Sequence, residues 1–359
     1  MARNKTLTEL RRDIDAVDQK LLALIAKRAR LALDVGRAKR RGARAVLDAA
    51  RERRVIAAVR DANPGPLRDD TIESIFREII SACRASQQPT SVAFFGPDGT
   101  FTHEAAVKQF GRSADFLAAA TIEEVFRAVE AGRAAFGVVP IENTTEGAVT
   151  PTLDALAETT ASVVSEVSVK VDQCLMAASN DPAAVRRITS HPQALAQCRR
   201  YLAEHFPKAE QIPAASTTAA AALAKKRRGT AAVGSRLAAA LYDLQIVARA
   251  IQDNPANVTR FMVLGMPTST PATGRDRTSL VVSVKDEVGI LERVIRPFSR
   301  HEVNLSMIES RPLHGRPWEY RFFIDVTGHR DDENVGKAIA AVERIALAVK
   351  ILGSYPVGD

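Results

Sequence analysis

The sequence is poor in cysteine, tryptophan and other aromatic residues. Of its 359 residues, three are cysteine and one is tryptophan, and aromatic side chains make up 5%. Cys83, Cys174 and Cys198 are odd in number and lack the spacing of metal ligands, so we expect reduced, buried thiols and no metal site. Few aromatic side chains are available to stack on bases, which disfavours binding to nucleic acid.

Long apolar runs are missing as well. No stretch approaches the roughly 18 consecutive apolar residues of a membrane-spanning helix, and Met1–Leu10 lacks the apolar segment of a secretory signal. These absences favour a cytoplasmic protein without membrane contacts. A chain of 359 residues is too long for a single hydrophobic core, so we expect two or three domains.

The formal net charge of +8 is concentrated at one end of the chain. Residues 1–60 contain 17 Lys and Arg against 7 Asp and Glu, whereas the rest of the chain is slightly acidic. A basic arm of this kind can bind nucleic acid. A small polyanion bound inside a helical domain explains the charge at least as well, because the basic residues are interleaved with a helical pattern that must pack.

Residues 7–38 carry apolar side chains three and four positions apart, the heptad pattern of packed helices. Nine of the ten positions in this seam are apolar, and the exception is Arg28. A guanidinium is costly to bury without a partner, so we expect an anionic group to meet it. From this pattern alone, a polar residue that sets the register of a coiled coil remains an equal alternative.

Local signals predict three helices in residues 1–88. Thr6 and Glu9 form a capping box at the start of the first helix, and a basic cluster before Gly42 indicates its end. We expect the second helix over 48–62 and the third over 69–86. Residues 87–90 are expected to be a linker.

The spacing along the first helix constrains where a ligand can bind. Arg28 and Lys39 are 11 residues apart, which places them on nearly the same face and about 16 Å apart along the axis. Arg11 is 28 residues from Lys39, or about 42 Å. One small ligand cannot touch both from a single straight helix, so any contribution from Arg11 requires a second chain packed antiparallel.

Beyond Ser91 the pattern changes to alternating strands and helices, which predicts an α/β domain over 91–266. Three polar segments follow apolar runs and are expected to be loops that bind a ligand, as in open α/β sheets. They are Gly96–Thr102, Pro140–Gly147 and Asn257–Phe261. Taken singly, each is more often an ordinary turn.

After a Pro-, Thr- and Gly-rich linker, residues 277–355 follow the order βαββαβ, which predicts a ferredoxin-like unit. The complete chain is therefore expected to be multidomain, with an all-helical domain, an α/β domain and a ferredoxin-like domain.

The helical region resembles the all-helical chorismate mutase family. The stretches that carry the resemblance are Leu10–Asp18, Val35–Lys39, Asp48 and Arg51–Arg53. The resemblance implies an intertwined helical dimer whose sites combine residues of both chains and use no cofactor.

The same resemblance assigns roles to single residues of the helical region. The arginines that bind carboxylates are matched by Arg11 of a partner chain, Arg28 and Arg51. The donors to the ether oxygen are matched by Lys39 and Gln87, and the groups beside the ring hydroxyl by Glu52 and Asp48. Cys83 stands where well-known members have serine, which is a departure from the family pattern.

Residues 92–265 resemble prephenate dehydratase. The matching stretches are Gly96–Phe101, Pro140–Gly147, Ser190–Leu195 and Thr259–Phe261. The resemblance implies a cleft between two α/β lobes and makes Thr259 the best candidate to act on the departing hydroxyl, with Glu142 as the second candidate. Expected substrate contacts are Thr100, Asn143, Thr144, Gln193, Ser216, Thr259 and Arg260. His191 precedes Pro192 and is more often a residue that shapes the loop than an acid.

The last domain resembles the phenylalanine-binding ACT domain. Glu309-Ser310-Arg311-Pro312 carries the resemblance, together with the turn Val288–Leu291 that contains Gly289. Ile290 stands where relatives often have alanine. The resemblance implies an effector pocket, for which the candidates are Gly289, Ile290, Leu291, Asn304, Leu305, Glu309, Ser310, Arg311 and Pro312. Alternatively, the fold is kept for dimerisation alone.

Together these resemblances imply a bifunctional enzyme of phenylalanine biosynthesis that converts chorismate to prephenate and prephenate to phenylpyruvate. It is expected to form a homodimer or a higher homo-oligomer and to respond to L-phenylalanine. Two alternatives remain open: a dehydratase that uses arogenate, and an amino-acid-responsive regulator built from the same domains. A regulator would be expected to carry a DNA-reading helix-turn-helix, and none is visible in the sequence.

Overall fold

The computed structural model describes residues 5–41, 48–267, 271–312 and 319–358, without the side chains of 39–41 and Ala49. The chain divides into two compact units. The first contains residues 1–90 together with 110–115, and the second contains the remaining residues. No helix in the described ranges is both long and apolar enough to cross a membrane.

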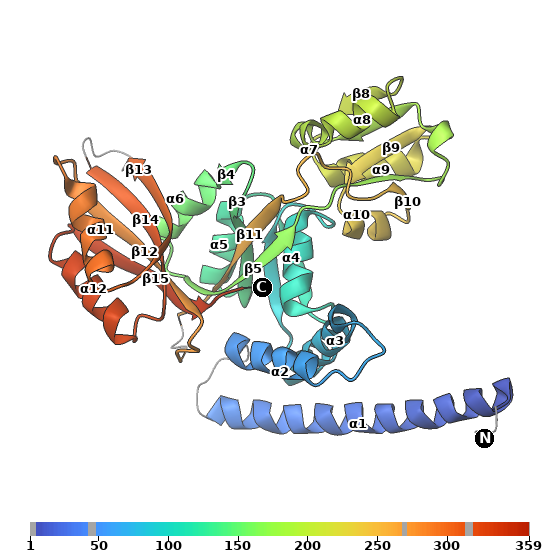
Figure 1. The fold of residues 1–359 in the computed structure, drawn as a ribbon, viewed down its shortest axis with the longest axis horizontal. Coiled ribbons are helices and arrows are strands. Elements are labelled where there is room, and N and C mark those ends of the chain that lie inside the picture. The colour runs from blue at the N-terminus through green and yellow to red at the C-terminus, as the bar shows by residue number, and fades with distance from the viewer. Residues whose placement is uncertain (1–4, 42–47, 268–270, 313–318, 359) are drawn as a thin grey trace. The chain divides into compact units, whose positions relative to one another are not determined.

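The first unit is helical, as the sequence predicted. It contains α1 (Leu7–Arg41), which runs unbroken in Figure 1, α2 (Ala49–Asp61) and α3 (Asp69–Gln87). The predicted capping box is confirmed, because Thr6 N donates to Glu9 Oε2 at 2.8 Å and Glu9 N donates to Thr6 Oγ1 at 3.3 Å. The backbone N–H and the hydroxyl group of Thr6, which both donate to this carboxylate, hold the pKa of Glu9 below its ordinary value.

Much of the apolar seam of α1 is exposed. Leu10, Ile14, Val17, Leu21 and Leu24 expose between 46% and 63% of their surface. Leu31 and Val35, nearer the carboxyl end, are also exposed, whereas the neighbouring Gly36 is buried against α3. A seam of this length that faces solvent provides a surface for another helix.

The second unit begins with a lobe built on a mixed sheet of order β2-β1-β3-β11-β5, with β4 paired to β3. β1 and β3 are parallel, whereas β11 is antiparallel to both of its neighbours. The elements of this lobe are β1 (Ser91–Phe95), α4 (Phe101–Phe110), β2 (Asp115–Ala119), α5 (Ile122–Glu130), β3 (Phe136–Asn143), β4 (Gly147–Ala148), α6 (Thr150–Glu158), β5 (Ser162–Lys170) and β11 (Val258–Gly265).

Two of the predicted loops are partly strand in this lobe. Residues 140–143 continue β3, and Val258 through Phe261 open β11. Proline normally ends a ladder because it lacks an N–H. Here β1 pairs with β3 only as far as Val138, and the pairing with β11 shifts by one residue at Ile141, between Pro140 and Glu142. The strand continues through Pro140, which is opposite Phe261 of β11.

A second lobe carries a sheet of order β10-β6-β9-β7-β8, in which β7 is parallel to β8 and β9. The chain crosses between the lobes over residues 171–173 and 249–257. The elements are β6 (Cys174–Ala177), a 3-10 turn (Pro182–Ala184), β7 (Arg187–Ser190), α7 (Pro192–Gln197), α8 (Arg199–His205), β8 (Glu210–Pro213), α9 (Thr217–Lys226), β9 (Thr230–Gly234), α10 (Arg236–Leu241) and β10 (Gln245–Ala248).

The three cysteines are free and buried, as predicted. Burial raises the pKa of the Cys198 thiol to about 12 and also raises the pKa of Cys174. Thiols in such surroundings stay protonated and unreactive at neutral pH.

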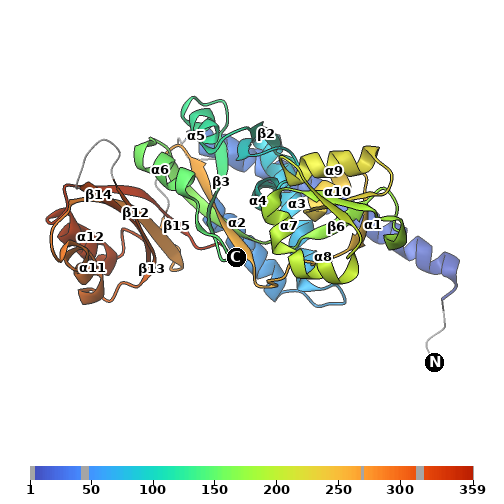
Figure 2. The ribbon, with the colours of Figure 1, turned by 90° about the horizontal axis from the view of Figure 1, so that it is seen from above.

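The predicted βαββαβ unit is confirmed. Its antiparallel sheet has the order β13-β14-β12-β15, and both helices cover one face (Figures 1 and 2). The elements are β12 (Asp276–Lys285), α11 (Ile290–Arg300), β13 (Leu305–Pro312), β14 (Glu319–Thr327), α12 (Glu333–Glu343) and β15 (Ala348–Pro356).

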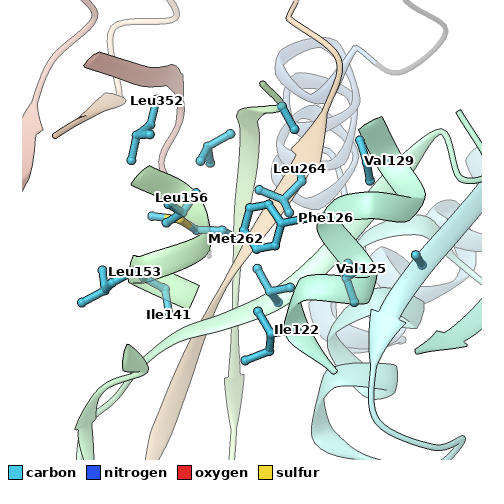
Figure 3. Packing of buried hydrophobic residues seen from close by; sticks show 14 of the residues in the cluster. Ile122, Val125, Phe126, Val129, Ile141, Leu153, Leu156, Met262, Leu264 and Leu352 are labelled. Carbon is cyan, nitrogen blue, oxygen red and sulfur yellow. The ribbon is translucent and has the colours of Figure 1, made fainter. Parts of the chain in front are cut away.

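The two faces of this sheet belong to different cores. Leu280, Val282 and Val284 point toward the helices and lie in one cluster with residues of α11 and α12. Val281 of β12 and Phe323 of β14 point to the opposite face of the sheet. They belong to a second cluster, which also contains Val129 of α5 and other residues of the first lobe. Figure 3 shows this shared core, with Leu352 of β15 near Leu156 of α6.

Candidate active sites

Arg28 reaches from α1 to the backbone of α3. Its Nη1 donates to Ile79 O at 3.5 Å, and its side chain is half-buried. Cys83 lies one turn beyond Ile79 and is buried. One turn further, Gln87 packs on α1 so closely that a Cβ on Gly36 would lie 2.9 Å from Gln87 Cγ. Three of the predicted mutase residues therefore line one contact between two helices.

The remaining predicted residues of α1 are far apart within one chain. Arg11 is exposed, and about 42 Å of continuous helix separates it from Lys39. The Lys39 side chain lies outside the described part of the structure. Its backbone is in the last turns of α1, three residues after the glycine that Gln87 contacts.

Asp48 lies just before α2 rather than inside it. Its Oδ1 accepts from Arg51 N at 2.9 Å and caps the helix. Glu52, in the first turn, accepts from Arg84 Nη1 through both carboxylate oxygens, at 2.6 and 2.8 Å. The predicted residues Asp48, Arg51 and Glu52 are thus close together in the structure. Both carboxylates, those of Asp48 and Glu52, already accept hydrogen bonds from groups of the protein itself.

Arg84 was missed by the sequence analysis. Only 4% of the residue is exposed, and besides Glu52 it donates to Phe110 O at 2.5 Å and lies over the Phe110 ring. The signal was present in the sequence, because an arginine stands beside Cys83 in the apolar stripe of α3. It is the same kind of exception that drew attention to Arg28.

In the second unit, Thr259 is held by Asn143. The two residues are opposite each other on β11 and β3, and Asn143 Nδ2 donates to Thr259 Oγ1 at 2.8 Å. The amide oxygen of Asn143 accepts from the backbone N–H groups of Thr145 and Glu146, at 2.9 and 3.0 Å. Since the threonine oxygen is already an acceptor, its own proton is available for donation to another group.

The loop after β1 is held by a buried histidine. His103 Nδ1 accepts from Gly99 N at 3.0 Å, and its ring stacks on Phe94 with centroids 4.5 Å apart. Burial lowers the pKa of His103, against the opposing effect of Asp98. Thr100, a predicted substrate contact, accepts from His103 N at 3.3 Å and opens α4. Thr144, another predicted contact, accepts from Val258 N at 3.0 Å.

The predicted contacts of the second lobe lie where parallel strands end. Ser216 caps α9 by accepting from Ala219 N at 3.0 Å, while Gln193 is exposed on the short helix α7. His191 caps that helix by accepting from Gln193 N at 3.4 Å, which agrees with its interpretation as a loop-shaping residue.

The two lobes meet at their strand ends. Ser235, which follows β9, donates to Gly99 O at 2.6 Å. Gly99 lies in the loop after β1, and Asn143 ends the neighbouring parallel strand β3. The carboxyl ends of strands from both lobes therefore face the same region, where open α/β sheets bind ligands.

Arg260 was predicted to contact substrate, and the structure places its guanidinium among three carboxylates. They are Glu142 at 3.3 Å, Glu166 at 3.2 Å and Asp325 at 2.7 Å, and 12% of the Arg260 side chain is exposed. Glu142, the second candidate acid, is thus paired with this cation and is 44% exposed.

Glu104 is a second residue that the sequence analysis missed. It follows Thr100 by one turn of α4, and burial raises the pKa of its carboxyl group against the effect of Arg236. Buried carboxyl groups with a raised pKa are common at functional sites. The sequence motif was analysed only as far as Thr102, two residues before Glu104.

The effector candidates fall into two groups. Pro312 of β13 and Val284 of β12 both pair with Tyr320, so the Glu309–Pro312 segment and the Gly289 turn lie at the same end of the sheet. Asn304 and Leu305 lie at the opposite end of β13, about 23 Å away. Within one chain the candidates therefore lie at two ends of one strand, and Asn304 and Leu305 remain predicted effector contacts.

Arg311 of the first group contacts the first lobe. Its Nε and Nη2 donate to the two carboxylate oxygens of Asp154 on α6, at 3.3 and 3.2 Å. Ile290 is half-buried and Leu291 is exposed at the start of α11, after Gly289 with φ of 77°.

Known families match all three regions of the chain. Residues 10–88 match chorismate mutase type II, residues 92–269 match prephenate dehydratase, and residues 278–344 match the ACT domain. The bifunctional chorismate mutase/prephenate dehydratase of Pseudomonas aeruginosa is 40% identical over 362 residues, covering 99% of both chains. The chain belongs to the bifunctional chorismate mutase/prephenate dehydratase family. It is therefore an enzyme with both catalytic domains and an ACT domain.

Other relatives agree over similar lengths. The bifunctional chorismate mutase/prephenate dehydratase of Escherichia coli is 32% identical, covering 99% of this chain and 97% of its own. Prephenate dehydratase from Arthrobacter aurescens, solved in complex with L-Phe, is 37% identical with a TM-score of 0.69, and the match covers 74% of this chain and 90% of that one. GqqA, a quorum quenching acylase, has the same TM-score at 29% identity, over 74% of this chain and 98% of its own.

Proposed function

We propose that the helical domain rearranges chorismate to prephenate. The rearrangement needs no nucleophile, so the site must hold the folded conformer and stabilise negative charge on the ether oxygen. Fixed cations and a neutral amide meet both needs. The observation that carries the proposal is the half-buried Arg28 at a helix contact that also contains Gln87.

The proposed mutase site requires two chains. Arg11 and Lys39 are too far apart on one helix to touch the same small molecule, and the apolar seam of α1 is exposed. Antiparallel pairing of two α1 helices would cover the seam and bring the partner's Arg11 toward Arg28 and Lys39. We therefore propose a dimer as the smallest active form of the mutase.

Charge removal tests the mutase assignment. Arg28→Ala and Lys39→Ala should each cost about 3 kcal/mol of transition-state stabilisation, measured from kcat/KM with chorismate. Dehydratase turnover of the same variants, assayed with prephenate, is the control. Near-normal mutase activity in both variants would refute the assignment.

We propose that the α/β domain converts prephenate to phenylpyruvate. The bond to the ring carboxylate breaks, CO2 leaves, and its electron pair enters the ring while the bond to the C4 oxygen breaks. The departing hydroxyl takes a proton and becomes water. Aromatisation drives the step, so one oriented donor is sufficient. Asn143 holds the Thr259 oxygen, which supports Thr259 as that donor.

Substitution of the two candidate donors distinguishes them. Thr259→Ala should lower kcat with prephenate by about 100-fold or more, the usual contribution of a positioned proton donor. Thr259→Ser keeps the hydroxyl and should retain most of the turnover. If Thr259→Ala remains active while Glu142→Gln is inactive, the assignment is reversed. Parallel assays with arogenate determine which substrate the site prefers.

We also propose that L-phenylalanine inhibits the dehydratase through the ACT domain. Two observations support this: the family match and the L-Phe complex of the Arthrobacter relative. The proposed binding segments, Glu309–Pro312 and the Gly289 turn, lie at one end of the sheet. Dehydratase rates measured against phenylalanine concentration should fall, and a flat response would refute the proposal.

A further inference from the structure

An arginine of α3 holds one of the predicted mutase carboxylates. Arg84 Nη1 donates to both carboxylate oxygens of Glu52 on α2, at 2.6 and 2.8 Å. The Arg84 side chain is 5% exposed, whereas the Glu52 side chain is 24% exposed. The ion pair therefore consists of a buried cation and a carboxylate that is still accessible to a ligand.

The guanidinium is fixed on its other side as well. Arg84 Nη2 donates to Phe110 O at 2.5 Å, and the guanidinium carbon lies 5.4 Å from the centre of the Phe110 ring, which is fully buried. The segment that follows Phe110 packs on α3, where Arg112 N donates to Glu78 Oε2 at 3.1 Å. Because the guanidinium is held on two sides, it cannot turn away from Glu52 without breaking these contacts.

The contact with Arg84 leaves Glu52 able to bind a hydroxyl group. A carboxylate oxygen has two lone pairs, so each oxygen of Glu52 can accept from a ligand while it is bonded to Arg84. A glutamate without such a partner samples several rotamers. Fixing the carboxylate before the substrate arrives favours binding, because less conformational freedom is then lost in the complex.

The ion pair lies among the predicted residues of the mutase site. Glu52 is in the first turn of α2, after the Asp48 cap. Arg84 comes directly after Cys83 on α3, and Gln87 follows Arg84 by three residues, so these two side chains share a face of the helix. The pair therefore connects the two short helices on which these predicted contacts lie.

We propose that Arg84 is a positioning residue of the mutase. It holds the Glu52 carboxylate where that group accepts a hydrogen bond from the ring hydroxyl of chorismate, and it does not itself touch the substrate. This inference rests on the proposed mutase function and on the predicted place of Glu52 beside that hydroxyl. An apolar residue in place of Arg84 would complete the apolar stripe of α3 but would leave Glu52 without this partner.

The test compares chorismate with an analogue that lacks only the ring hydroxyl. The measured quantity is the ratio of kcat/KM for chorismate to kcat/KM for the analogue. Arg84→Met removes the guanidinium, so this ratio should fall about 10-fold or more, the effect of one hydrogen bond to a charged group. A general loss of packing or of positive charge would lower both values of kcat/KM and leave the ratio unchanged, which would overturn the inference.

Glu52→Ala shows whether Arg84 acts through Glu52. A residue that acts only through its partner has no further effect once the partner is removed. The ratio should therefore be as low in Glu52→Ala as in the double variant that also carries Arg84→Met. A further fall in the double variant would overturn the inference, because Arg84 would then act on the substrate by another route.

Glu78→Ala is the matched control. It removes the bond from Arg112 N, which also joins α3 to the segment after Phe110 but does not touch Glu52. The ratio should stay within about twofold of wild type, since the two contacts share no partner. An equal fall of the ratio in Glu78→Ala and Arg84→Met would overturn the inference, because it would indicate packing of this segment rather than orientation of Glu52.

Arg84→Leu provides a second variant if Arg84→Met does not fold, because leucine continues the apolar stripe of α3. Dehydratase turnover with prephenate and the thermal unfolding transition report on the folding of both variants. A wild-type ratio in either folded variant would overturn the inference. That failure is distinct from failure of the proposed mutase function, which Arg28→Ala and Lys39→Ala test by themselves.

Discussion

At the residue scale, Asn143 connects four groups of the proposed dehydratase site through one amide. Its nitrogen donates to Thr259 Oγ1 and to Asn257 Oδ1, both at 2.8 Å. Its oxygen accepts from two backbone N–H groups of the turn that follows β3. Only an amide supplies donors on one side and an acceptor on the other, so neither a carboxylate nor an apolar residue can replace it.

Asn143→Asp tests this arrangement with almost no change in volume. The carboxylate cannot donate to Thr259, so we expect kcat with prephenate to fall about 100-fold, a typical effect of losing one oriented donor in an active site. Mutase turnover should not change. Steady-state kinetics with both substrates measure the effect, and an unchanged dehydratase kcat would contradict the role given to this amide.

The burial of His103 predicts how the free energy of unfolding depends on pH. Burial lowers its folded-state pKa below the ordinary value of 6.5, so the folded protein favours the neutral ring that accepts from Gly99. The stability that this ring contributes is fully present above about pH 6.5. It is lost as the pH falls from there toward the lowered folded-state pKa.

In the variant His103→Asn, the asparagine side chain can still accept a hydrogen bond but does not titrate. His103→Asn should therefore weaken the loss of stability between about pH 6.5 and 5, measured from thermal unfolding transitions. His205→Asn, at an exposed position, is the control and should reproduce the wild-type slope. The same slope in all three proteins would show that His103 does not carry the effect.

At the element scale, α1 is a long helix whose apolar seam faces solvent over most of its length. Leu21 lies near the middle of the seam and is 50% exposed. A lysine there would place a charge inside the proposed pairing of two α1 helices but leaves the contact of Gly36 with α3 intact. The helix of a single chain should tolerate it, because lysine has good helix propensity.

Leu21→Lys should therefore give monomeric helical domains and lower mutase kcat/KM at least 100-fold, since the partner's Arg11 would be lost. Dehydratase activity should persist. Mutase activity that depends on protein concentration, followed by sedimentation, distinguishes weakened pairing from misfolding. Full mutase activity in a monomer would contradict the two-chain site.

The helices of the first unit could be predicted from sequence because their ends carry local signals. The capping box at Thr6 and Glu9 and the Asp48 cap both lie where the sequence indicates a helix start. The strands at 140–143 and 258–261 could not be predicted, because polar residues and a proline usually mark loops. Their pairing depends on neighbours far away in sequence, namely β11 and β5.

Some residues could not be identified from the sequence for a similar reason. Arg28 interrupts a seam long enough to define a period, so it is visible as an exception. Arg84 and Asp325 interrupt short segments. Their partners, Glu52 and Arg260, lie 32 and 65 residues away in the sequence. Long-range ion pairs of this kind leave no periodic signal in a single sequence.

At the scale of the whole molecule, α6 joins the predicted effector motif to the dehydratase lobe. Arg311 pairs with Asp154, Arg321 pairs with Glu158, and the Lys350 ammonium group donates to carbonyl groups at the end of the helix. The start of α6 is tied to β3 through the bond from Thr152 Oγ1 to Pro140 O, at 2.6 Å. A change at Arg311 therefore has a direct path to the strand that carries Asn143.

Asp154→Asn frees Arg311 from α6 and should change the phenylalanine concentration for half-inhibition about 3- to 30-fold, the range of typical couplings. Glu158→Gln removes a neighbouring ion pair outside the effector motif and should have little effect. Dehydratase rates over a phenylalanine series measure both variants. An unchanged half-inhibition in Asp154→Asn would exclude this pair from the response.

The hydrophobic core in Figure 3 bears on how the proposed inhibition by phenylalanine could be removed. Deleting the ACT domain is the simplest engineering route, and it assumes a boundary that can be cut. Here Phe323 and Tyr355 of the ACT domain share one core with Met262 of the first lobe. A truncated enzyme would lose four buried residues of that core, Val281, Phe323, Leu352 and Tyr355, and leave Arg260 without Asp325. Point substitutions at the proposed effector segments would leave this core and this ion pair in place.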